Sequence, residues 1–336
     1  MNVAIVGATG AVGEEMLLCL QQRDFPVKNL RLLASARSKG RKLAFRGTEV
    51  EVEELTDASF GGIDIALFSA GASISRKFGP AAAAAGALVV DNSSAFRMDD
   101  DIPLVVPEIN PDAAFDHPRN IIANPNCTTI VTLMAVGPLH RAFQVETLWV
   151  ASYQAVSGSG AKGIYELETQ MRQSVSGEEV RTGIYPRPIV SNVIPLIGAL
   201  EPNGYTQEEM KMQSESRKIL GHPGLRASAT CVRVPVFRSH SVAVTAAFAR
   251  PATPAAARKV LAEAPGVQVM DDPANLVFPT PLDSTDKDDC LVGRIRTDLA
   301  MDNALAFWVV GDQVRKGAAL NAVQIAELVA GGRPQG

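Results

Sequence analysis

Cysteine, histidine and aromatic residues are scarce in this chain of 336 residues. It contains four cysteines, four histidines and two tryptophans, and aromatic side chains account for 5% of the residues. The cysteines, Cys19, Cys127, Cys231 and Cys290, lie far apart and form no C-x-x-C pair. This spacing argues against a zinc site and a redox dithiol, so we expect no metal. It also favours a reducing cytoplasm, in which disulfides are not expected.

Long runs of one residue class are missing as well. No stretch approaches the ~20 apolar residues that a transmembrane helix needs. The N-terminal MNVAIVGATG lacks the basic region and cleavage site of a secretory signal, and we interpret it as a strand. The formal net charge is −4 and no long basic run occurs, which disfavours nucleic acid as a partner. The composition, 46% apolar and 20% charged, is that of a globular protein, and the length predicts two domains.

Residues 1–125 show strands that alternate with helices. The apolar NVAIV is followed by GATGAVG and by the helical EEMLLCLQQR, and LRLLAS is a second strand. IDIALFSAG and ALVVDNSS are further strands, with an alanine-rich helix at roughly 73–86 between them. This order predicts a Rossmann-type, doubly wound parallel sheet covered on both faces, in an α/β nucleotide-binding domain.

Residues 126–312 have a different pattern. ETLWVASYQAVSG, SATCVRVPVF, SVAVTAAFARP, LVGRIRTD and ALAFWVVGD are longer β-type runs separated by loops and two helices. They predict an α+β domain with a mixed or antiparallel sheet and helices on one face. Such a sheet often offers its flat face to a second subunit, so we expect a homodimer or tetramer. In residues 313–336 the spacing predicts a C-terminal helix that packs back on the first domain, through Ala319, Val323, Ile325, Ala326 and Val329.

The glycines of the first turn have the spacing G-x-x-G-x-x-G, directly after a strand and at the start of a helix. Glycines there allow a tight turn and close approach to a pyrophosphate, whose charge is met by the N–H groups of the helix end. The alternative is an ordinary tight turn between a strand and a helix. The strand–turn–helix context favours a dinucleotide, held by Gly7, Thr9, Gly10, Ala11, Val12 and Gly13.

The end of the second strand indicates which dinucleotide binds. An NAD enzyme usually places Asp or Glu there to hold the ribose 2′-hydroxyl. This chain has LLASARSKGRK, without an acid and with several hydroxyl and basic side chains. Because a 2′-phosphate favours guanidinium and hydroxyl donors, we expect NADP. The candidate residues are Ser35, Arg37 and Ser38, with Lys39 and Arg41 nearby.

Cys127, in ANPNCTT, lies where an extended segment meets a helix. Pro125 favours an extended conformation for Asn124, and the sequence from Thr128 is helical at least to Pro138. The positive end of a helix favours the thiolate form of a cysteine. Reactivity is therefore a better explanation of Cys127 than packing. Beside a nicotinamide, a thiolate can add to an aldehyde, and loss of hydride leaves a thioester.

Such chemistry also needs an acid or base. His117 lies in a loop before a proline, His140 lies at a helix end, and His222 lies in GHPG. His240 instead lies at a break between two β runs, where a side chain can project into a cleft. We therefore expect His240 to be the acid/base.

The chain resembles the aspartate-semialdehyde dehydrogenases over essentially its whole length. The matching motifs, in order, are GATGAVG, ASARSKG, DNSSAFRM, NPNCTT, SYQAVSGSGAKG, EEMKM, CVRVPV with HS beyond it, and KGAALNAVQIAE. The resemblance implies reversible, NADP-dependent, phosphorylating oxidation of aspartate 4-semialdehyde to aspartyl 4-phosphate. The biosynthetic direction is the reductive one, towards lysine through diaminopimelate, methionine and threonine.

The resemblance also implies roles for individual residues. Cys127 would be the nucleophile, His240 the acid/base, and Gln154 would help to position the substrate and the cysteine. Arg233 would hold the α-carboxylate, Glu208 would lie near the α-ammonium, and the phosphate pocket would contain Arg97, Asn126 and Lys211. The positions that match contacts to the nicotinamide end of the cofactor are Ser157, Gly158 and Asn321.

Alternatives remain. N-acetyl-γ-glutamyl-phosphate reductase shares the fold and the Cys/His chemistry, but its substrate has no free ammonium for Glu208. Glyceraldehyde-phosphate dehydrogenase favours NAD and has a different cysteine context. A non-catalytic paralogue should have lost Cys127, Gln154 or His240. One departure is that many relatives have glycine before the histidine, where this chain has Ser239 after Arg238; serine fits if the backbone there does not need a positive φ.

Overall fold

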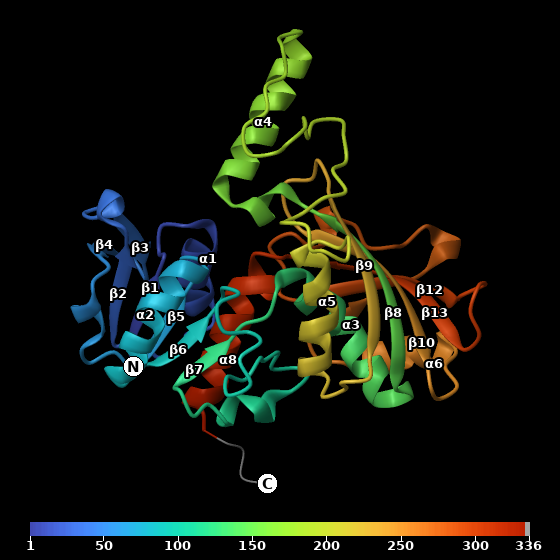
Figure 1. Cartoon of the computed structure of the whole chain (residues 1–336), viewed down its shortest axis with the longest axis horizontal. Coiled ribbons are helices and arrows are strands. Elements are labelled where there is room, and N and C mark those ends of the chain that lie inside the picture. Colours follow the sequence, from blue (N-terminus) through green and yellow to red (C-terminus); the bar gives the residue numbers. More distant parts are fainter. Residues whose placement is uncertain (333–336) are drawn as a thin grey trace. The chain divides into compact units, whose positions relative to one another are not determined.

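The computed structural model describes residues 1–332, which form two compact units (Figure 1). The first comprises Met1–Asn126 and the described residues from Gly317 onward, and the second is Cys127–Lys316. Each unit has its own sheet. Among the described residues, no helix has both the length and the apolar character needed to span a membrane.

The first unit contains a seven-stranded sheet in the order β3-β4-β2-β1-β5-β6-β7. All neighbouring strands are parallel except β3 and β4, which form an antiparallel hairpin. The predicted doubly wound sheet is therefore confirmed, while the hairpin was not predicted. The strands are β1 (Asn2–Val6), β2 (Asn29–Ala34), β3 (Lys42–Phe45), β4 (Thr48–Glu54), β5 (Ile65–Phe68), β6 (Leu88–Asp91) and β7 (Ile121–Ala123).

Helices cover this sheet because its strands are apolar on both sides. α1 (Ala11–Gln22) and α8 (Leu320–Ala330) pack together against one set of alternate strand residues, which includes Val3 and Ile5. α2 (Ala72–Ala84) contacts β5 and β6. The predicted return of the C-terminal helix to the first domain is confirmed (Figure 1). Short helical turns are η1 (Ala36–Ser38), η2 (Asp57–Phe60) and η3 (Pro111–Phe115).

The second unit contains a six-stranded sheet in the order β11-β12-β13-β10-β8-β9. The outer pairs β8–β9 and β11–β12 are parallel and the other pairs are antiparallel, so the predicted mixed sheet is confirmed. The strands are β8 (Val145–Gln154), β9 (Arg226–Arg233), β10 (His240–Phe248), β11 (Val267–Val269), β12 (Cys290–Thr297) and β13 (Ala304–Gly311).

Helices lie against one face of this sheet. α3 (Cys127–Phe143), α5 (Gln207–Ile219) and α6 (Pro254–Ala262) contact its strands, and α3 is buried from Thr128 to Leu139. α3 continues beyond Pro138, because burial of an almost wholly apolar helix outweighs the one hydrogen bond that proline removes. The opposite face exposes Trp149 and Tyr153 of β8.

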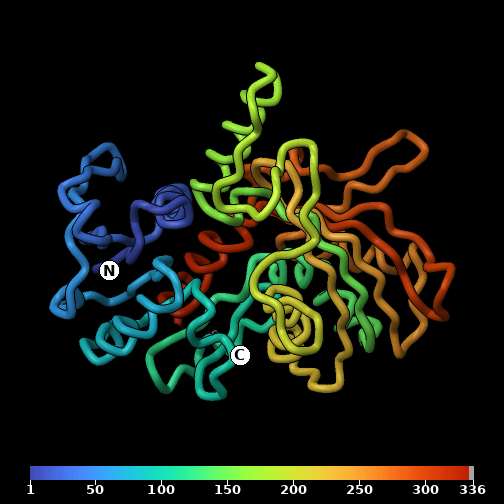
Figure 2. The backbone as a smooth tube through the Cα atoms, turned by 45° about the horizontal axis from the view of Figure 1, so that its top comes forward, coloured from blue at the N-terminus to red at the C-terminus, as the bar shows by residue number. Residues whose placement is uncertain are grey.

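The segment that follows β8 leaves the sheet as an arm. It contains η4 (Val156–Ser159) and α4 (Ala161–Ser176), and both Figure 1 and Figure 2 show α4 projecting from the sheet of its unit. The buried carboxylate of Glu166 accepts hydrogen bonds from the N–H groups of Gly183 and Ile184, which fastens the returning chain to α4. The remaining short elements are η5 (Pro273–Asn275), α7 (Pro281–Ser284) and a π-helical turn, η6 (Arg315–Ala319).

Candidate active site

Three strands of the second unit bring three predicted residues together at one end of the sheet, where β8 and β9 finish and β10 begins. Gln154 at the end of β8 is paired in register with Arg233 at the end of β9. On the other side of β8, Tyr153 is paired with Ser241, which places His240 at the same end. All three side chains are buried. Their proximity is therefore a consequence of strand register. Gln154 is about 80 positions from the other two residues in sequence, and only the folded sheet brings them together.

Cys127 is the first residue of α3, as its sequence context predicted. Its Sγ lies 3.6 Å from Nε2 of His240 and the side chain is half-buried. The other three cysteines are buried. Burial raises the pKa of the Cys231 thiol to about 12, which keeps it protonated at neutral pH. Cys127 therefore combines access, a helix N-terminus and a neighbouring imidazole.

His240 is fully buried, and its ring is oriented by the backbone of Ala155. The N–H of Ala155 donates to Nδ1 over 3.1 Å. Nδ1 is therefore the unprotonated nitrogen, and the neutral ring carries its proton on Nε2, towards Cys127. Burial and then the positive charge of Arg233 lower the pKa of His240 well below its usual value. The ring is thus held neutral, with a donor directed at the sulfur.

Arg233 is also buried and is only partly satisfied. Its Nη1 donates to the carbonyl of Ala155 over 2.6 Å, whereas its buried Nε has no partner among residues 1–332. A Cβ at Gly158 would lie 2.9 Å from Nη1 of Arg233 and 3.2 Å from Cε1 of His240. A side chain there would crowd both groups. Glycine at this position therefore keeps open the space beside the guanidinium and the imidazole.

Gln154, Glu208 and Lys211 form a connected polar group. Gln154 Nε2 donates to Glu208 Oε1 over 3.3 Å, and Lys211 Nζ lies 2.9 Å from Glu208 Oε2. Glu208 and Lys211 are one turn apart on α5, which begins with a capping box between Thr206 and Glu209. Both oxygens of Glu208 are thus engaged before any ligand is considered.

The two predicted phosphate-pocket residues of the first unit, Arg97 and Asn126, lie in its loops after β6 and β7. Arg97 is buried and donates from Nε to the carbonyl of Asn124 and from Nη2 to the carbonyl of Asn92, each over 2.9 Å. Asn126, the residue before Cys127, is buried as well. The loop that carries Arg97 is anchored by Asp91, whose carboxylate accepts from the hydroxyl of Ser93; burial raises the pKa of Asp91.

The glycine loop follows β1, and its backbone conformation suits the binding of a dinucleotide. Gly7 has φ +85°, and a Cβ at Gly13 would meet the carbonyl oxygen of Gly7 at 2.2 Å, so both positions require glycine. Gly10 is the N-cap of α1 and provides no side-chain cap. The first N–H groups of α1 therefore have no competing side-chain acceptor at Gly10, as anion binding at a helix end requires. Thr9 belongs to the same turn, and Ala11 and Val12 are the first two residues of α1.

The end of β2 lies beside this loop. Thr9 Oγ1 is 3.2 Å from Ser38 Oγ, and both Ser35, the N-cap of η1, and Arg37 within η1 are exposed. At the end of β2, Ala34 is paired with Glu54 of β4. The Oε2 atom of Glu54 lies 3.8 Å from Nζ of Lys39. Exposed hydroxyl and guanidinium groups therefore follow β2 next to the glycine loop.

The remaining predicted positions have different surroundings. Ser157 is buried in η4 and is hydrogen bonded by Gln313. Asn321, on α8 in the first unit, is fully buried and donates from Nδ2 to Val105 and Asn124. Ser239 has φ +72°, so the condition under which serine would fit without strain is not met.

Sequence reasoning missed Ala155. Its N–H orients His240 and its carbonyl orients Arg233, yet its methyl group gives no chemical signal. Only the motif SYQAVSG, read as a backbone turn beside two charged or titratable groups, could have pointed to it.

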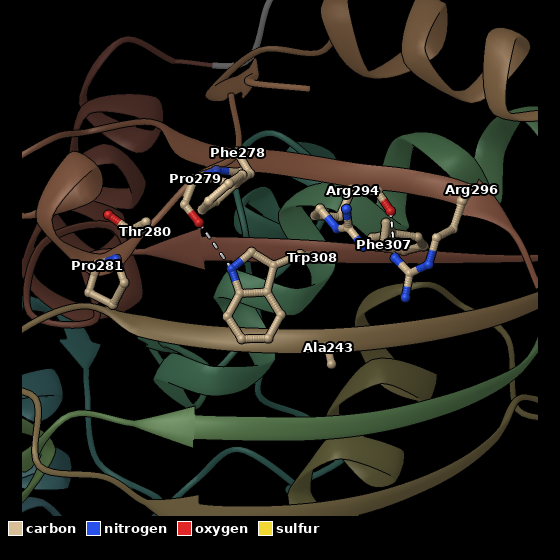
Figure 3. A pocket seen from close by; sticks show the side chains of 9 residues that line it. All are labelled: Ala243, Phe278, Pro279, Thr280, Pro281, Arg294, Arg296, Phe307 and Trp308. Carbon is tan, nitrogen blue, oxygen red and sulfur yellow. Dashed lines mark hydrogen bonds between the residues drawn. The ribbon is translucent and has the colours of Figure 1, made fainter. Parts of the chain in front are cut away.

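A separate cavity of about 430 Å³ lies in the second unit, on the face of its sheet that α3, α5 and α6 leave uncovered. Figure 3 shows Trp308 of β13 at its centre, with the indole N–H directed at the carbonyl of Pro279. None of the predicted site residues lines it. Its walls are Ala243, Phe278, Pro279, Thr280, Pro281, Arg294, Arg296, Phe307 and Trp308.

Comparison with known proteins agrees with this arrangement. Residues 2–117 match the family model described as semialdehyde dehydrogenase, NAD binding domain, and residues 136–316 match semialdehyde dehydrogenase, dimerisation domain. The aspartate-semialdehyde dehydrogenase of Synechocystis sp. is 49% identical over 98% of this chain and 97% of its own length.

Solved structures lead to the same family. The structure of aspartate semialdehyde dehydrogenase II of Vibrio cholerae complexed with ASA has a TM-score of 0.96 and 46% identity, and covers 98% of both chains. That of the Candida albicans enzyme with NADP has a TM-score of 0.76 and 25% identity, again covering 98% of both chains. Fold, motifs and near-full-length similarity together show that this chain belongs to the aspartate-semialdehyde dehydrogenases, which are oxidoreductases of amino-acid biosynthesis.

Proposed function

We propose that this enzyme is NADP-dependent and phosphorylating, and that it interconverts aspartate 4-semialdehyde and aspartyl 4-phosphate through a thioester on Cys127. The observation that carries this proposal is the 3.6 Å approach of Cys127 Sγ to Nε2 of a buried His240, beside Gln154 and Arg233. A thioester suits the reaction because its acyl group passes reversibly to and from phosphate. The first unit would bind the cofactor and the second would perform the chemistry.

In the oxidative direction, the thiolate of Cys127 adds to the aldehyde carbon and forms a tetrahedral adduct. Nε2–H of His240 donates to the oxygen as negative charge develops on it, which is the donor role that the Ala155 hydrogen bond favours. When bound, the nicotinamide cofactor supplies the hydride acceptor. The resulting thioester is cleaved by phosphate, which takes the acyl group and restores the thiolate.

Substrate recognition is assigned to the charged groups around Cys127. Arg233 has a buried Nε without a partner among the described residues, which suits the α-carboxylate of the substrate. Glu208 would take the α-ammonium, and Lys211, Arg97 and Asn126 would take the phosphate. Because Lys211 contacts Glu208 at 2.9 Å, ligand binding would divide this ion pair between the ammonium and the phosphate.

Cofactor contacts are assigned to the glycine loop from Gly7 to Gly13 and to Ser35, Arg37 and Ser38. Ser157 and Gly158 would contact the nicotinamide end. For Asn321, whose Nδ2 already donates to Val105 and Asn124, the assignment rests on the motif alone. We also propose a cytoplasmic location, which cell fractionation would test.

A second copy of this chain is the proposed partner, bound to the open face of the second unit's sheet. This face exposes Trp149 and Tyr153 and contains the cavity around Trp308 (Figure 3). Exposed aromatic groups beside an apolar cavity are typical of protein interfaces. The matching family model is itself described as a dimerisation domain, which favours a homodimer.

Turnover tests the function directly. The enzyme is expected to form NADPH from aspartate 4-semialdehyde only when phosphate is present, and not from N-acetylglutamate semialdehyde. Cys127→Ser should lower kcat by at least ~10³-fold, because an alcohol is a far weaker nucleophile and acyl carrier, while NADP binding stays nearly unchanged. Cys231→Ser is the matched control and should stay active.

The outcomes separate the alternatives. Turnover of the acetylated aldehyde would contradict the role of Glu208 and favour the N-acetyl-γ-glutamyl-phosphate reductase. No turnover of either aldehyde would favour a non-catalytic paralogue.

The cofactor preference depends on Arg37. Arg37→Ala should raise the KM for NADP by roughly 10–100-fold, the loss of one or two charge-assisted hydrogen bonds, and leave the KM for NAD within about twofold. Steady-state kinetics with both cofactors measure this, with Lys42→Ala on β3 as the control. Equal effects on both cofactors would argue against a 2′-phosphate contact.

The lowered pKa of His240 predicts how stability depends on pH. Between its usual pKa and its lower folded-state pKa, the unfolded chain binds a proton that the folded chain excludes, so stability falls as the pH drops below 6.5. Wild type should lose up to about 1.4 kcal/mol per pH unit more than His240→Gln in this window. Urea denaturation at pH 7.5 and at pH 5.5 measures the difference. Parallel losses in both proteins would show that the buried imidazole does not resist protonation.

Self-association through the open face is tested by Trp149→Glu. A carboxylate there should shift sedimentation from dimer to monomer, because burying an unpaired charge in an interface is unfavourable. Leu299→Glu, a change at a fully exposed leucine in the turn between β12 and β13, is the control. A Trp149→Glu protein that remains dimeric would place the interface elsewhere.

A further inference from the structure

The backbone just before His240 is strained and is held in place. Ser239 is buried and has φ +72°, a conformation that residues with a Cβ rarely adopt. Because His240 follows directly, the backbone angles at Ser239 set where the imidazole lies relative to Cys127. A strained conformation persists only when neighbouring groups fix it.

Those neighbouring groups come from residues 285–313. The N–H of Ser239 donates to Gln313 Oε1 over 2.8 Å, and its Oγ lies 3.0 Å from Thr285 Oγ1. Arg238 Nε donates to Asp312 Oδ2 over 2.7 Å. Strand register explains the proximity, since His240 is paired with Gly311 and the residues that follow Gly311 therefore lie beside the turn.

Asp312 is the centre of this network. Its side chain is fully buried, and each carboxylate oxygen accepts two hydrogen bonds. Oδ2 accepts from Arg238 Nε and from the N–H of Asp286 at 2.8 Å, and Oδ1 accepts from the N–H groups of Val314 and Arg315. Arg238 also lies 2.9 Å from Asp286. One carboxylate thus ties together the three segments that surround Ser239.

We propose that Arg238 and Asp312 are positioning residues, which hold Ser239 in its left-handed conformation so that Nε2 of His240 faces the sulfur of Cys127. This inference rests on the proposed acid/base role of His240. It makes the ion pair a support for the geometry of the Cys127–His240 contact.

The chain contains a matched control pair. Arg258 and Asp271 form an equivalent ion pair at 2.8 Å in the same unit, and the fully buried carboxylate of Asp271 accepts from the N–H groups of Arg294 and Ile295. Arg258→Gln should therefore cost similar stability without reaching His240. Arg238→Gln should lower kcat by about tenfold or more, with the KM of both substrates within threefold, whereas Arg258→Gln should keep kcat within twofold.

A second readout needs no turnover. The rate at which iodoacetamide alkylates Cys127, followed against pH, reports the coupling between the thiol and His240. This profile should shift in Arg238→Gln and remain that of wild type in Arg258→Gln. A wild type without turnover would refute the proposed function, while an unshifted alkylation profile would refute only the positioning role.

Glycine at position 239 provides a rescue. Because glycine adopts a positive φ without strain, Ser239→Gly added to Arg238→Gln should restore at least a third of the wild-type kcat. If Arg238→Gln does not fold, Thr285→Val removes only the hydroxyl opposite Ser239 and should lower kcat by about two- to fivefold at unchanged KM. Equal losses in the Arg238 and Arg258 variants, an unshifted alkylation profile or the absence of rescue would overturn the proposal.

Discussion

The register of β8 with its two neighbours is the constraint on which the candidate site depends. Pairing Gln154 with Arg233 and Tyr153 with Ser241 places the amide of Gln154, the guanidinium of Arg233 and the imidazole next to Ser241 at one end of the sheet. A shift of one residue would turn each of these side chains to the opposite face. The alternation in β8, where Trp149 and Tyr153 are exposed and Gln154 is buried, therefore specifies both the open face and the site.

Ala155 is hydrogen bonded to both His240 and Arg233, two groups that would repel each other if both were charged. Two cationic side chains buried side by side would be costly. The N–H of Ala155 occupies Nδ1 of His240 and favours the neutral ring, while its carbonyl accepts from Arg233 and stabilises the cation. The backbone of one residue thus assigns the charge to Arg233 and the neutral donor to His240. The lowered pKa of His240 has the same origin, because burial and Arg233 both disfavour the imidazolium.

Much of the fold could be predicted from sequence, and so could four residues that the structure brings close together, Cys127, Gln154, Arg233 and His240. Local signals were strong where one segment determines its own structure, as in GATGAVG, in the helix after Cys127 and in the apolar strands. The hairpin of β3 and β4 was missed because TEVEVEE is rich in acid and weakly apolar, and its turn at Arg46 and Gly47 uses two positive φ angles. The functional role of Ala155 had no signal because only its backbone contributes.

Ser239 illustrates the remaining limit of the sequence. Whether serine was acceptable depended on φ. That angle depends on contacts that Ser239 makes with Thr285 and Gln313, at least 46 residues away, and that Arg238 makes with Asp312. A glycine at this position would adopt the same backbone without support. Serine instead makes the conformation conditional on the Arg238–Asp312 pair. The geometry of the Cys127–His240 contact is then shared between a local backbone angle and a distant buried carboxylate, and neither determines it alone.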